Sequence, residues 1–372
     1  MTTVLSFQRV IRNLSYHPSV RRGLLRVFDA DTIEFSRSYG MMQKGDISIG
    51  FSTWVSPKRT RSYPFARLYN IYHLPKRITV IPIIKDEGIG GDCDRINAIT
   101  LSWMNLANVF FILAYYNKAR IGKDNKITKQ QFDSNHVRAY VREIWDYQQT
   151  ALHWNTMHFQ RDYRDIFLKA VQSYETISEQ LGVTLHNSND HLKALSKYSE
   201  NNQFKLELFR KKSLEASRLA MINESVTQHR HEFLQEGAKG LFTLKNYLGG
   251  EYHLTADEIY FVGDEVIIQE SKNATRGKLP KLSDIQDGLF KLILFANLDE
   301  LILNNVSRSF RVRLKLTGPL LSTLRLPITN LAEIETFSIM NALSPADRKL
   351  LLMLNEEVVA NPKLEILIAG NS

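Results

Sequence analysis

Hydrophobic positions recur with a helical period over the middle of the chain. From about residue 128 to 248 the pattern is mostly helical, and Val137, Val141 and Ile144 keep the i, i+4, i+7 spacing of one helix face. Gly182 and the polar run HNSND that follows it interrupt this pattern. We therefore expect at least two helices in this region.

The segment before it is mixed. The β-branched run RITVIPIIK at 77–85 predicts a strand, and Pro82 predicts an edge position or a strand end. The acidic, Gly-rich stretch at 86–94 predicts a loop. Residues 95–120 carry apolar side chains, Trp103 among them, at helical spacing, which predicts a buried helix.

Strand-like patterns follow residue 250. Residues 258–262 and 265–272 flank Gly263-Asp264, which has the composition of a two-residue II′ hairpin turn. Ser283 and Gln286 have the spacing of a capping box and predict the start of a helix. The remaining expected elements are strands at 300–306 and 310–316, a helix from Ser344-Pro345, and a strand-like tail near 364–369. Together they predict a mixed sheet with helices packed on it.

The composition is that of a soluble globular protein, with 44% hydrophobic and 23% charged residues among 372. No apolar run is long enough for a membrane helix, and the N-terminus lacks the order of a signal peptide. The one cysteine, Cys93, excludes an intrachain disulfide and a zinc cage made of cysteines. We expect a cytoplasmic protein without membrane association.

The net charge of +9 is unevenly distributed. Residues 1–85 contain 14 Lys and Arg against 4 acids, a balance of +10, so the other 287 residues sum to −1. A basic segment on a near-neutral body is typical of a protein that binds a polyanion, most commonly nucleic acid. A merely soluble basic protein is an equal alternative on charge alone.

The candidate chemistry lies in the expected hairpin. If Gly263 and Asp264 form the turn, paired residue numbers sum to 527, so Asp257 faces Glu270 and Lys272 lies on the same face. Two carboxylates this close repel each other unless a cation lies between them, and Mg²⁺ suits such hard oxygen ligands. The lysine would position or help to deprotonate a water and would offset charge on a phosphoryl oxygen. This set of groups suits phosphodiester hydrolysis.

Asp257, twelve intervening residues and then Glu270-Ser271-Lys272 resemble the catalytic signature of the PD-(D/E)xK nuclease superfamily. In that superfamily the acid opens one strand of a hairpin and E-x-K lies on the next. Residues 278–298 are similar to the helix that follows E-x-K in a group of type II restriction endonucleases, and PIIKDEG, SWMNLANVFFILAYY and ALHWN also resemble segments of such enzymes. Ala256 departs from the family pattern, which has Pro at this position.

The resemblance implies an α/β (α+β) fold with a restriction-endonuclease-like mixed sheet flanked by helices. It also implies Mg²⁺-dependent, sequence-specific cleavage of double-stranded DNA by a homodimer, leaving 5′-phosphate and 3′-hydroxyl ends. Asp257 and Glu270 would hold the metal, and an additional acid is expected among Glu232, Glu236 and Glu251. The expected regions are a basic DNA-recognition region at 1–125, a mainly helical region at 126–235, and the nuclease core with a C-terminal extension at 236–372.

Other basic residues are candidates for DNA contacts. One set interleaves with aromatic residues in PKRTRSYPFAR, and another alternates along the strand at 310–316; the residues are Lys58, Arg59, Arg61, Arg67, Arg311, Arg313 and Lys315. The alternatives are an ordinary basic loop for the first set and the solvated face of an outer strand for the second.

The acidic residues also have structural interpretations that involve no catalysis. Glu270 and Lys272 suit a surface ion pair, and Asp257 suits a turn or cap after Thr255. The segment Asp86–Asp94 is better explained as a solvated loop than as a second metal site.

The histidines lack zinc-ligand spacing, which favours structural roles. The absence of a Walker-type Gly loop argues against a nucleotide cofactor. The rival functions are a non-catalytic DNA-binding or regulatory protein and a structure-specific repair or recombination nuclease.

Overall fold

The computed structural model describes residues 4–21, 26–34, 39–54, 57, 70, 73–97, 104–200, 203–226, 237–246, 251–303 and 305–371. The chain forms two compact units. The C-terminal unit consists of Met1–Gly23, Tyr69–Tyr72 and Ser217–Ser372, and the central unit of Leu24–Leu68 and His73–Ala216. The first residues of the chain thus belong to the same unit as the last.

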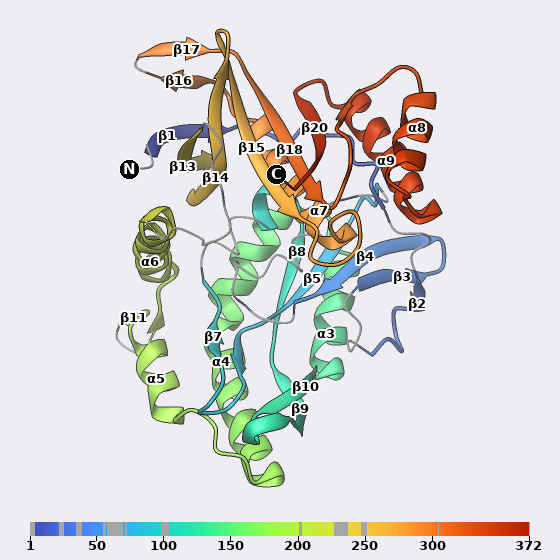
Figure 1. Cartoon of the computed structure of the whole chain (residues 1–372). Helices are drawn as coiled ribbons and strands as arrows, with labels where there is room; N and C mark the ends of the chain where they lie inside the picture. The colour runs from blue at the N-terminus through green and yellow to red at the C-terminus, as the bar shows by residue number, and fades with distance from the viewer. Residues whose placement is uncertain are drawn as a thin grey trace. The chain divides into compact units, whose positions relative to one another are not determined.

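A seven-stranded mixed sheet is the centre of the C-terminal unit (Figure 1). Its strands, in spatial order, are β1 (Val4–Ile11), β13 (Ala238–Asn246), β14 (Glu251–Val262), β15 (Glu265–Asn273), β18 (Phe310–Gly318), β20 (Leu364–Gly370) and β19 (Leu324–Leu326). The strands β13, β14 and β15 form an antiparallel meander, whereas β15, β18 and β20 are parallel. Parallel neighbours need crossover connections, and the helices of this unit provide them.

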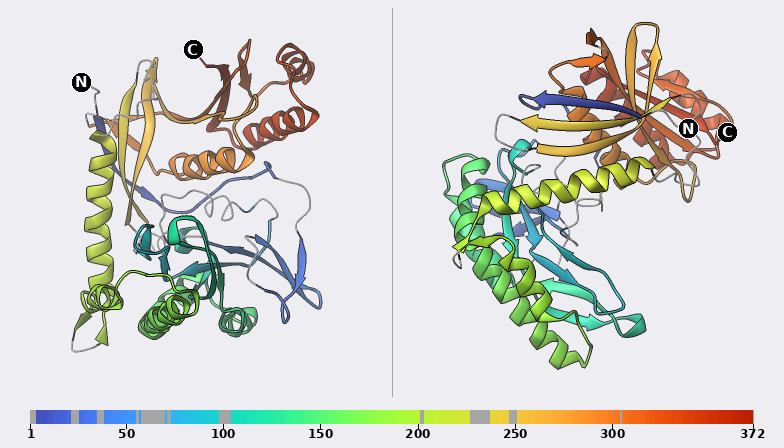
Figure 2. Two further views of the ribbon diagram at one scale, coloured as in Figure 1. Left: turned by 60° about the horizontal axis from the view of Figure 1, so that its bottom comes forward. Right: turned by 90° about the vertical axis from the view of Figure 1, so that its left-hand side faces the viewer.

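The helix α7 (Leu282–Ala296) connects β15 to β18 and packs against both strands, and Figure 2 shows it lying along one face of the sheet. Its buried stripe includes Ile285, Leu289 and Leu292. The other elements of this unit are the hairpin β16 (Leu301–Leu303) and β17 (Val306–Arg308) and the helices α8 (Ala332–Met340) and α9 (Pro345–Ala360). The helix α6 (Leu206–Val226) contains the boundary between the two units.

The central unit is built on a five-stranded mixed sheet. Its strands, in spatial order, are β2 (Val27–Asp29), β3 (Tyr39–Lys44), β4 (Ile47–Thr53), β5 (Arg77–Pro82) and β8 (Phe110–Ala114). The helices α3 (Ser134–Trp145) and α4 (Ala151–Leu181) pack on β8. Smaller elements complete the unit: the pairs β6 (Ile84–Asp86) with β7 (Cys93–Arg95), β9 (Tyr116–Ile121) with β10 (Ile127–Phe132), and β11 (Ser199–Glu200) with β12 (Gln203–Phe204), the 3-10 helix η1 (Lys123–Asn125), and α5 (Ser188–Ser196).

Several sequence predictions are confirmed. The helical spacing of Val137 and its neighbours lies in α3, and Gly182 ends α4 with a left-handed φ of 63°. The predicted strand at 77–85 begins as β5, which ends at Pro82. Ser344 caps α9 in a full capping box with Asp347. The overall class is confirmed as mixed α/β, with mixed sheets and packed helices.

The helix predicted at 95–120 is wrong. Where residues are described, this segment contains one helical turn from Met104 to Leu106 and then the strands β8 and β9. All of Phe110–Ala114 is buried, and such a continuous apolar run suits a buried strand as well as a helix. The strand β13 likewise lies in a region that was expected to be helical.

Two smaller predictions also fail. The capping box at Ser283 is absent, because α7 begins two residues earlier than a cap at Ser283 requires and its N-cap is Lys281, which makes no side-chain cap bond. The single strand predicted at 300–306 is instead split between the two arms of the hairpin β16–β17. Asn305, between those arms, adopts a left-handed φ of 62°.

Candidate active site

The strands β14 and β15 form the hairpin that the sequence predicts (Figure 1). The ladder runs from Val262 opposite Glu265 to Glu258 opposite Gln269. Gly263 takes φ of 61° in the turn, a conformation that favours glycine. The predicted register is therefore confirmed, and its next position places residue 257 opposite residue 270.

A β-bulge lies at Asp257. Between Ala238 and Gly240 of β13 the register with β14 shifts by one residue, so Asp257 and Glu258 together oppose Lys239. A bulge bends its strand and changes the direction of the side chains at that point. The strand β14 is thus regular up to the first acid of the motif and irregular at the acid itself.

Glu270 is buried between two lysines. Only 3% of the residue is exposed, and its Oε1 accepts from Lys272 Nζ at 3.0 Å while its Oε2 accepts from Lys291 Nζ at 2.7 Å. Burial alone would raise the pKa of Glu270, but the two ammonium groups outweigh it and hold the pKa below its usual range. Glu270 is therefore an ionised carboxylate with a cation on each oxygen.

Asp257 accepts a hydrogen bond from the backbone. Its Oδ2 receives the N–H of Ser271 at 2.8 Å, so the acid contacts the strand that carries Glu270. Burial and the charge of Glu270 raise the pKa of Asp257 to about 6, although Lys291 and Lys272 act against this. The carboxyl therefore titrates just below neutral pH and is mostly ionised above it.

The helix α7 adds two charged residues that the sequence analysis missed. Asp287 Oδ2 lies 3.3 Å from Lys272 Nζ, and Lys291, one turn later on the helix, binds Glu270. Burial would lower the pKa of Lys272, but Glu270 and Asp287 raise it, so the side chain is an ammonium group. The available signal was an i, i+4 pair of opposite charges beside the apolar stripe of α7.

Gly288 allows α7 to lie close to the site. A Cβ atom there would lie 2.8 Å from Leu314 Cδ1 and 3.2 Å from Lys272 Cε. Glycine within a helix costs about 1 kcal/mol relative to alanine, so a glycine at this place indicates a need for space. The missing side chain leaves room for the stem of Lys272 between helix and sheet.

The assembled site holds three carboxylates and two ammonium groups. Asp257, Glu270 and Asp287 contribute −3 when ionised and the two lysines +2, which leaves −1. Carboxylate oxygens are hard ligands of the kind that Mg²⁺ takes, and a net negative charge attracts a cation. The donor chemistry of Asp257 and Glu270 therefore fits Mg²⁺, and binding to Glu270 would replace one lysine contact.

The basic residues predicted on β18 lie on the other face of the sheet. Arg313 pairs in register with Gln269 and Lys315 with Ser271, whereas Glu270 pairs with Leu314. Arg311 and Arg313 form ion pairs with Glu265 and Glu365, so two of these three cations have carboxylate partners. The strand β18 also lies between β15 and β20, so the alternative of an outer strand is wrong.

Other predicted site residues lie apart from the hairpin or outside the described residues. Glu251, six residues before Asp257, is about 20 Å away along β14 and lies near Lys245 and His253, each at 3.8 Å. The remaining candidates fall outside the described residues: Lys58, Arg59, Arg61, Arg67, Glu232 and Glu236.

The expectation of a solvated acidic loop at 86–94 is wrong for two of its four acids. Asp86 and Asp94 are buried, Glu87 is half-buried, and Asp92 is exposed. The two ends of the loop pair as strands, with Asp86 opposite Cys93. Because the ends of the loop pair as strands, the side chains of Asp86 and Asp94 lie inside the central unit.

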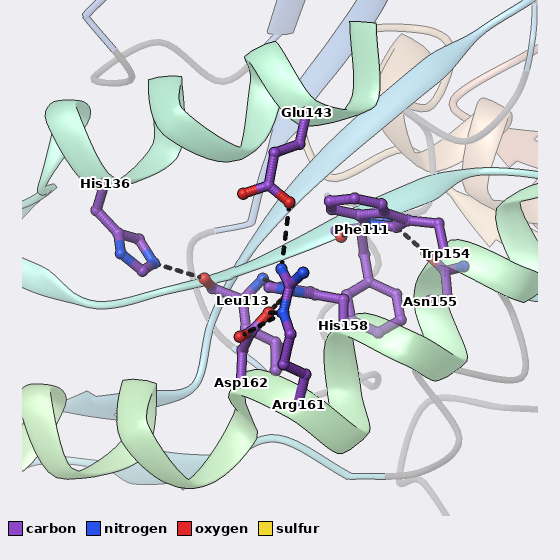
Figure 3. A network of polar contacts seen from close by, with 9 residues as sticks. All are labelled: Phe111, Leu113, His136, Glu143, Trp154, Asn155, His158, Arg161 and Asp162. Atoms are coloured by element: carbon purple, nitrogen blue, oxygen red, sulfur yellow. Dashed lines mark hydrogen bonds and ion pairs between the residues drawn. The ribbon is translucent and has the colours of Figure 1, made fainter. Parts of the chain in front are cut away.

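His158, one of the two histidines of α4, has the structural role predicted for the histidines (Figure 3). His158 Nε2 accepts the N–H of Leu113 at 3.0 Å, and its Nδ1 lies 2.7 Å from Asp162 Oδ2. The N–H of Phe111 donates to the side-chain oxygen of Asn155, and the carbonyl of Phe111 accepts from the indole N–H of Trp154. Because β8 is the last described strand of its sheet, these side chains satisfy backbone groups that no other described strand pairs.

Comparison of the chain with protein-family models, with curated proteins and with solved structures found no match. Within the described part of the chain, no helix is both long enough and apolar enough to cross a membrane. The functional assignment therefore depends on the geometry and chemistry of the site.

Proposed function

We propose that this chain is a Mg²⁺-dependent endonuclease of the PD-(D/E)xK type that cleaves double-stranded DNA at a specific sequence. It would hydrolyse the phosphodiester bond to leave 5′-phosphate and 3′-hydroxyl ends, and would act as a homodimer like many type II restriction enzymes. We also propose that the seven-stranded mixed sheet of the C-terminal unit is of the restriction-endonuclease type.

One observation carries the proposal: Asp257, Glu270 and Lys272 meet on one hairpin in the middle of a mixed sheet. Asp257 bonds the Ser271 N–H, and Lys272 bonds Glu270. The alternative of a surface ion pair fits poorly, because Glu270 is buried and its pKa is lowered by its two cations. A buried, charged cluster has a high desolvation cost, and such clusters occur preferentially at functional sites.

Each residue has a role in the proposed reaction. Asp257 and Glu270 would hold Mg²⁺, which supplies the Lewis acid for attack of water on phosphorus. Lys272 remains protonated, so it would stabilise negative charge on the phosphoryl oxygens rather than act as a base. Asp287 contacts Lys272 and would fix the position of its ammonium group.

The test is digestion of a plasmid of known sequence by the purified full-length chain with Mg²⁺ or with a chelator. We expect discrete fragments with Mg²⁺ only, and no cutting by Glu270→Gln or Lys272→Met, while both variants keep DNA binding. Glu300→Gln, an exposed change in the same unit, is the matched control and should cut normally.

The other outcomes distinguish the rival functions. Salt-sensitive DNA binding without scission would replace the proposal with a non-catalytic DNA-binding protein. Cutting at junctions or ends instead of a sequence would indicate a structure-specific nuclease. Discrete cutting that persists in both variants would exclude this site from the mechanism.

A further inference from the structure

Three potential metal ligands of different chemistry meet in the central unit, away from the hairpin β14–β15 in the sequence. Asp86 ends β6, Cys93 begins β7, and His191 lies on α5. The ladder of β6 and β7 places Asp86 directly opposite Cys93. One ligand atom from each of the three residues lies within 4.8 Å of the other two.

The separation of two of these groups suits a shared ion. His191 Nε2 lies 3.7 Å from Asp86 Oδ2, which is too long for a hydrogen bond. Two ligands of a tetrahedral ion, each about 2.0–2.2 Å from it, lie roughly 3.4 Å apart. Closure by a few tenths of an ångström would place both atoms on one metal ion.

The His191 ring supplies a second, independent observation. The residue is only 2% exposed, and its Nε2 atom has no hydrogen-bond partner among the residues that the structure describes. Buried polar atoms are satisfied in nearly all cases, so this atom requires an explanation. It lies 3.7 Å from the Asp86 carboxylate, and the thiol of Cys93 belongs to the same group of potential ligands.

The carboxylate is already oriented by its surroundings. Asp86 Oδ1 accepts from the Gly88 N–H and lies against His186 Nδ1, both at 2.8 Å, and Oδ2 accepts from the His186 N–H at 3.0 Å. Metal-binding carboxylates are commonly held by such outer hydrogen bonds. His186 therefore acts as a positioning residue for Asp86.

We propose that Asp86, Cys93 and His191 form a zinc site in the central unit, with solvent in the fourth position. The mixture of thiolate, imidazole and carboxylate suits Zn²⁺, whereas Mg²⁺ and Ca²⁺ prefer oxygen ligands alone. The ion would join α5 to the hairpin β6–β7, two elements that are about one hundred residues apart. This site is independent of the proposed nuclease chemistry.

Arg95 opposes metal binding and therefore gives a specific test. Its Nε donates to His191 Nδ1 at 3.3 Å, which places the proton of the neutral ring on Nε2. Zinc at Nε2 requires the proton on Nδ1 and a shift of Arg95 away from the ring. Replacing Arg95 should therefore strengthen zinc binding.

The experiment uses the purified full-length chain, first stripped with a chelator and then loaded with Co²⁺ or Zn²⁺. We expect about one tightly bound ion per chain and, with Co²⁺, the near-ultraviolet charge-transfer band of a cobalt thiolate. Cobalt at the carboxylates of the hairpin β14–β15 would lack this band. The readout on the unaltered chain needs no variant to fold and no nuclease activity.

Variants locate the ligands. Cys93→Ser should remove the band, His191→Gln should lower the affinity strongly, and Arg95→Ala should raise it. His186→Gln should keep the band and weaken affinity by about 10–100-fold. His153→Gln, an exposed histidine of the same unit, is the matched control. Absence of the band from the unaltered chain, or unchanged affinity in His191→Gln, would overturn the proposal.

Discussion

At the scale of single residues, the charges around Glu270 determine how the candidate site responds to pH and to cations. Both carboxylate oxygens contact ammonium groups, and burial together with the nearby charge of Glu270 raises the pKa of Asp257 to about 6. The sequence identified three of the five charged groups, because strand alternation and turn composition fix the positions of neighbours in a hairpin. Asp287 and Lys291 were missed: their i, i+4 spacing of opposite charges is visible in the sequence, but their contact with Lys272 and Glu270 depends on how α7 packs on the sheet.

Asp257→Asn should abolish cleavage and stabilise the metal-free fold. The pKa of Asp257 is raised in the folded chain, so folding is favoured when the carboxyl is protonated, and this stability is lost as pH rises through about 6. At about pH 8 the neutral amide removes that cost, a gain on the order of 3 kcal/mol. Denaturant unfolding with a chelator measures it.

The control for this change is Asp264→Asn in the exposed hairpin turn, which should alter neither stability nor cleavage. Wild-type cleavage should also fall as pH drops through about 6, because Asp257 then becomes protonated. A destabilised Asp257→Asn variant would indicate that the ionised acid has a structural role.

Lys291→Met should tighten Mg²⁺ binding. The ammonium group lies 2.7 Å from Glu270 Oε2 and competes with a metal ion for that oxygen. Its removal should raise Mg²⁺ affinity by on the order of tenfold, since unit charges a few ångströms apart interact strongly near a protein surface. Isothermal titration calorimetry would measure this, with the exposed Lys349→Met as control. Weaker binding would show that Lys291 assists the metal rather than competing with it.

At the scale of secondary-structure elements, tertiary packing determines whether a buried apolar run forms a helix or a strand when its sequence pattern suits both. The segment Phe110–Ala114 lies in the region predicted as a helix yet forms β8, because side chains from α4 satisfy its outer edge and make a buried edge strand tolerable. Elements with a strong local signal were predicted correctly, such as α9 with its Ser344-Pro345 start. The helix α7 was predicted as well, although the capping box that indicated its start is absent.

Gly288→Ala should lower both stability and activity, although alanine is the better helix former. The added Cβ would approach Leu314 and Lys272, so α7 must move away or Lys272 must change position. We expect a loss of about 1–3 kcal/mol, as for overpacking of a core, and reduced cleavage. Thermal unfolding and plasmid digestion measure the two effects.

Gly90→Ala is the matched control, because a Cβ there would make only an ordinary contact, 3.5 Å from Lys126 Cε. Equal losses of stability in the two variants would show that the close approach of α7 is not the cause.

At the scale of the whole molecule, the C-terminal unit includes both ends of the chain. The N-terminal segment after β1 is held by Glu357 of α9, whose side chain accepts from Tyr16 Oη at 2.8 Å and from the Val20 N–H at 2.9 Å. Contacts between residues more than three hundred positions apart have no local signal. The sequence therefore predicted the class of fold and the hairpin but not this arrangement of the first residues.

Glu357→Gln should make the stability of the C-terminal unit less dependent on pH. Burial raises the pKa of Glu357 to about 7, so the protonated form favours folding and its contribution is lost as pH rises through about 7. Wild-type thermal stability should fall between about pH 6 and pH 8.5, and the variant should fall less. The neighbouring exposed Glu356→Gln is the control. An identical pH dependence in both variants would contradict this role of Glu357.

The parallel pairing of β1 with β13 has a consequence for how the protein is made. Val4 pairs with Lys239, so these partners are 235 residues apart, and β1 emerges from the ribosome long before the strand it binds. Until then its backbone has no sheet to join, and unpaired strands of nascent chains are prone to aggregation. The central unit lies entirely between these two strands in the sequence and has its own sheet. Translation thus offers it time to fold first, while the sheet that carries Glu270 is completed only after β20 has been made.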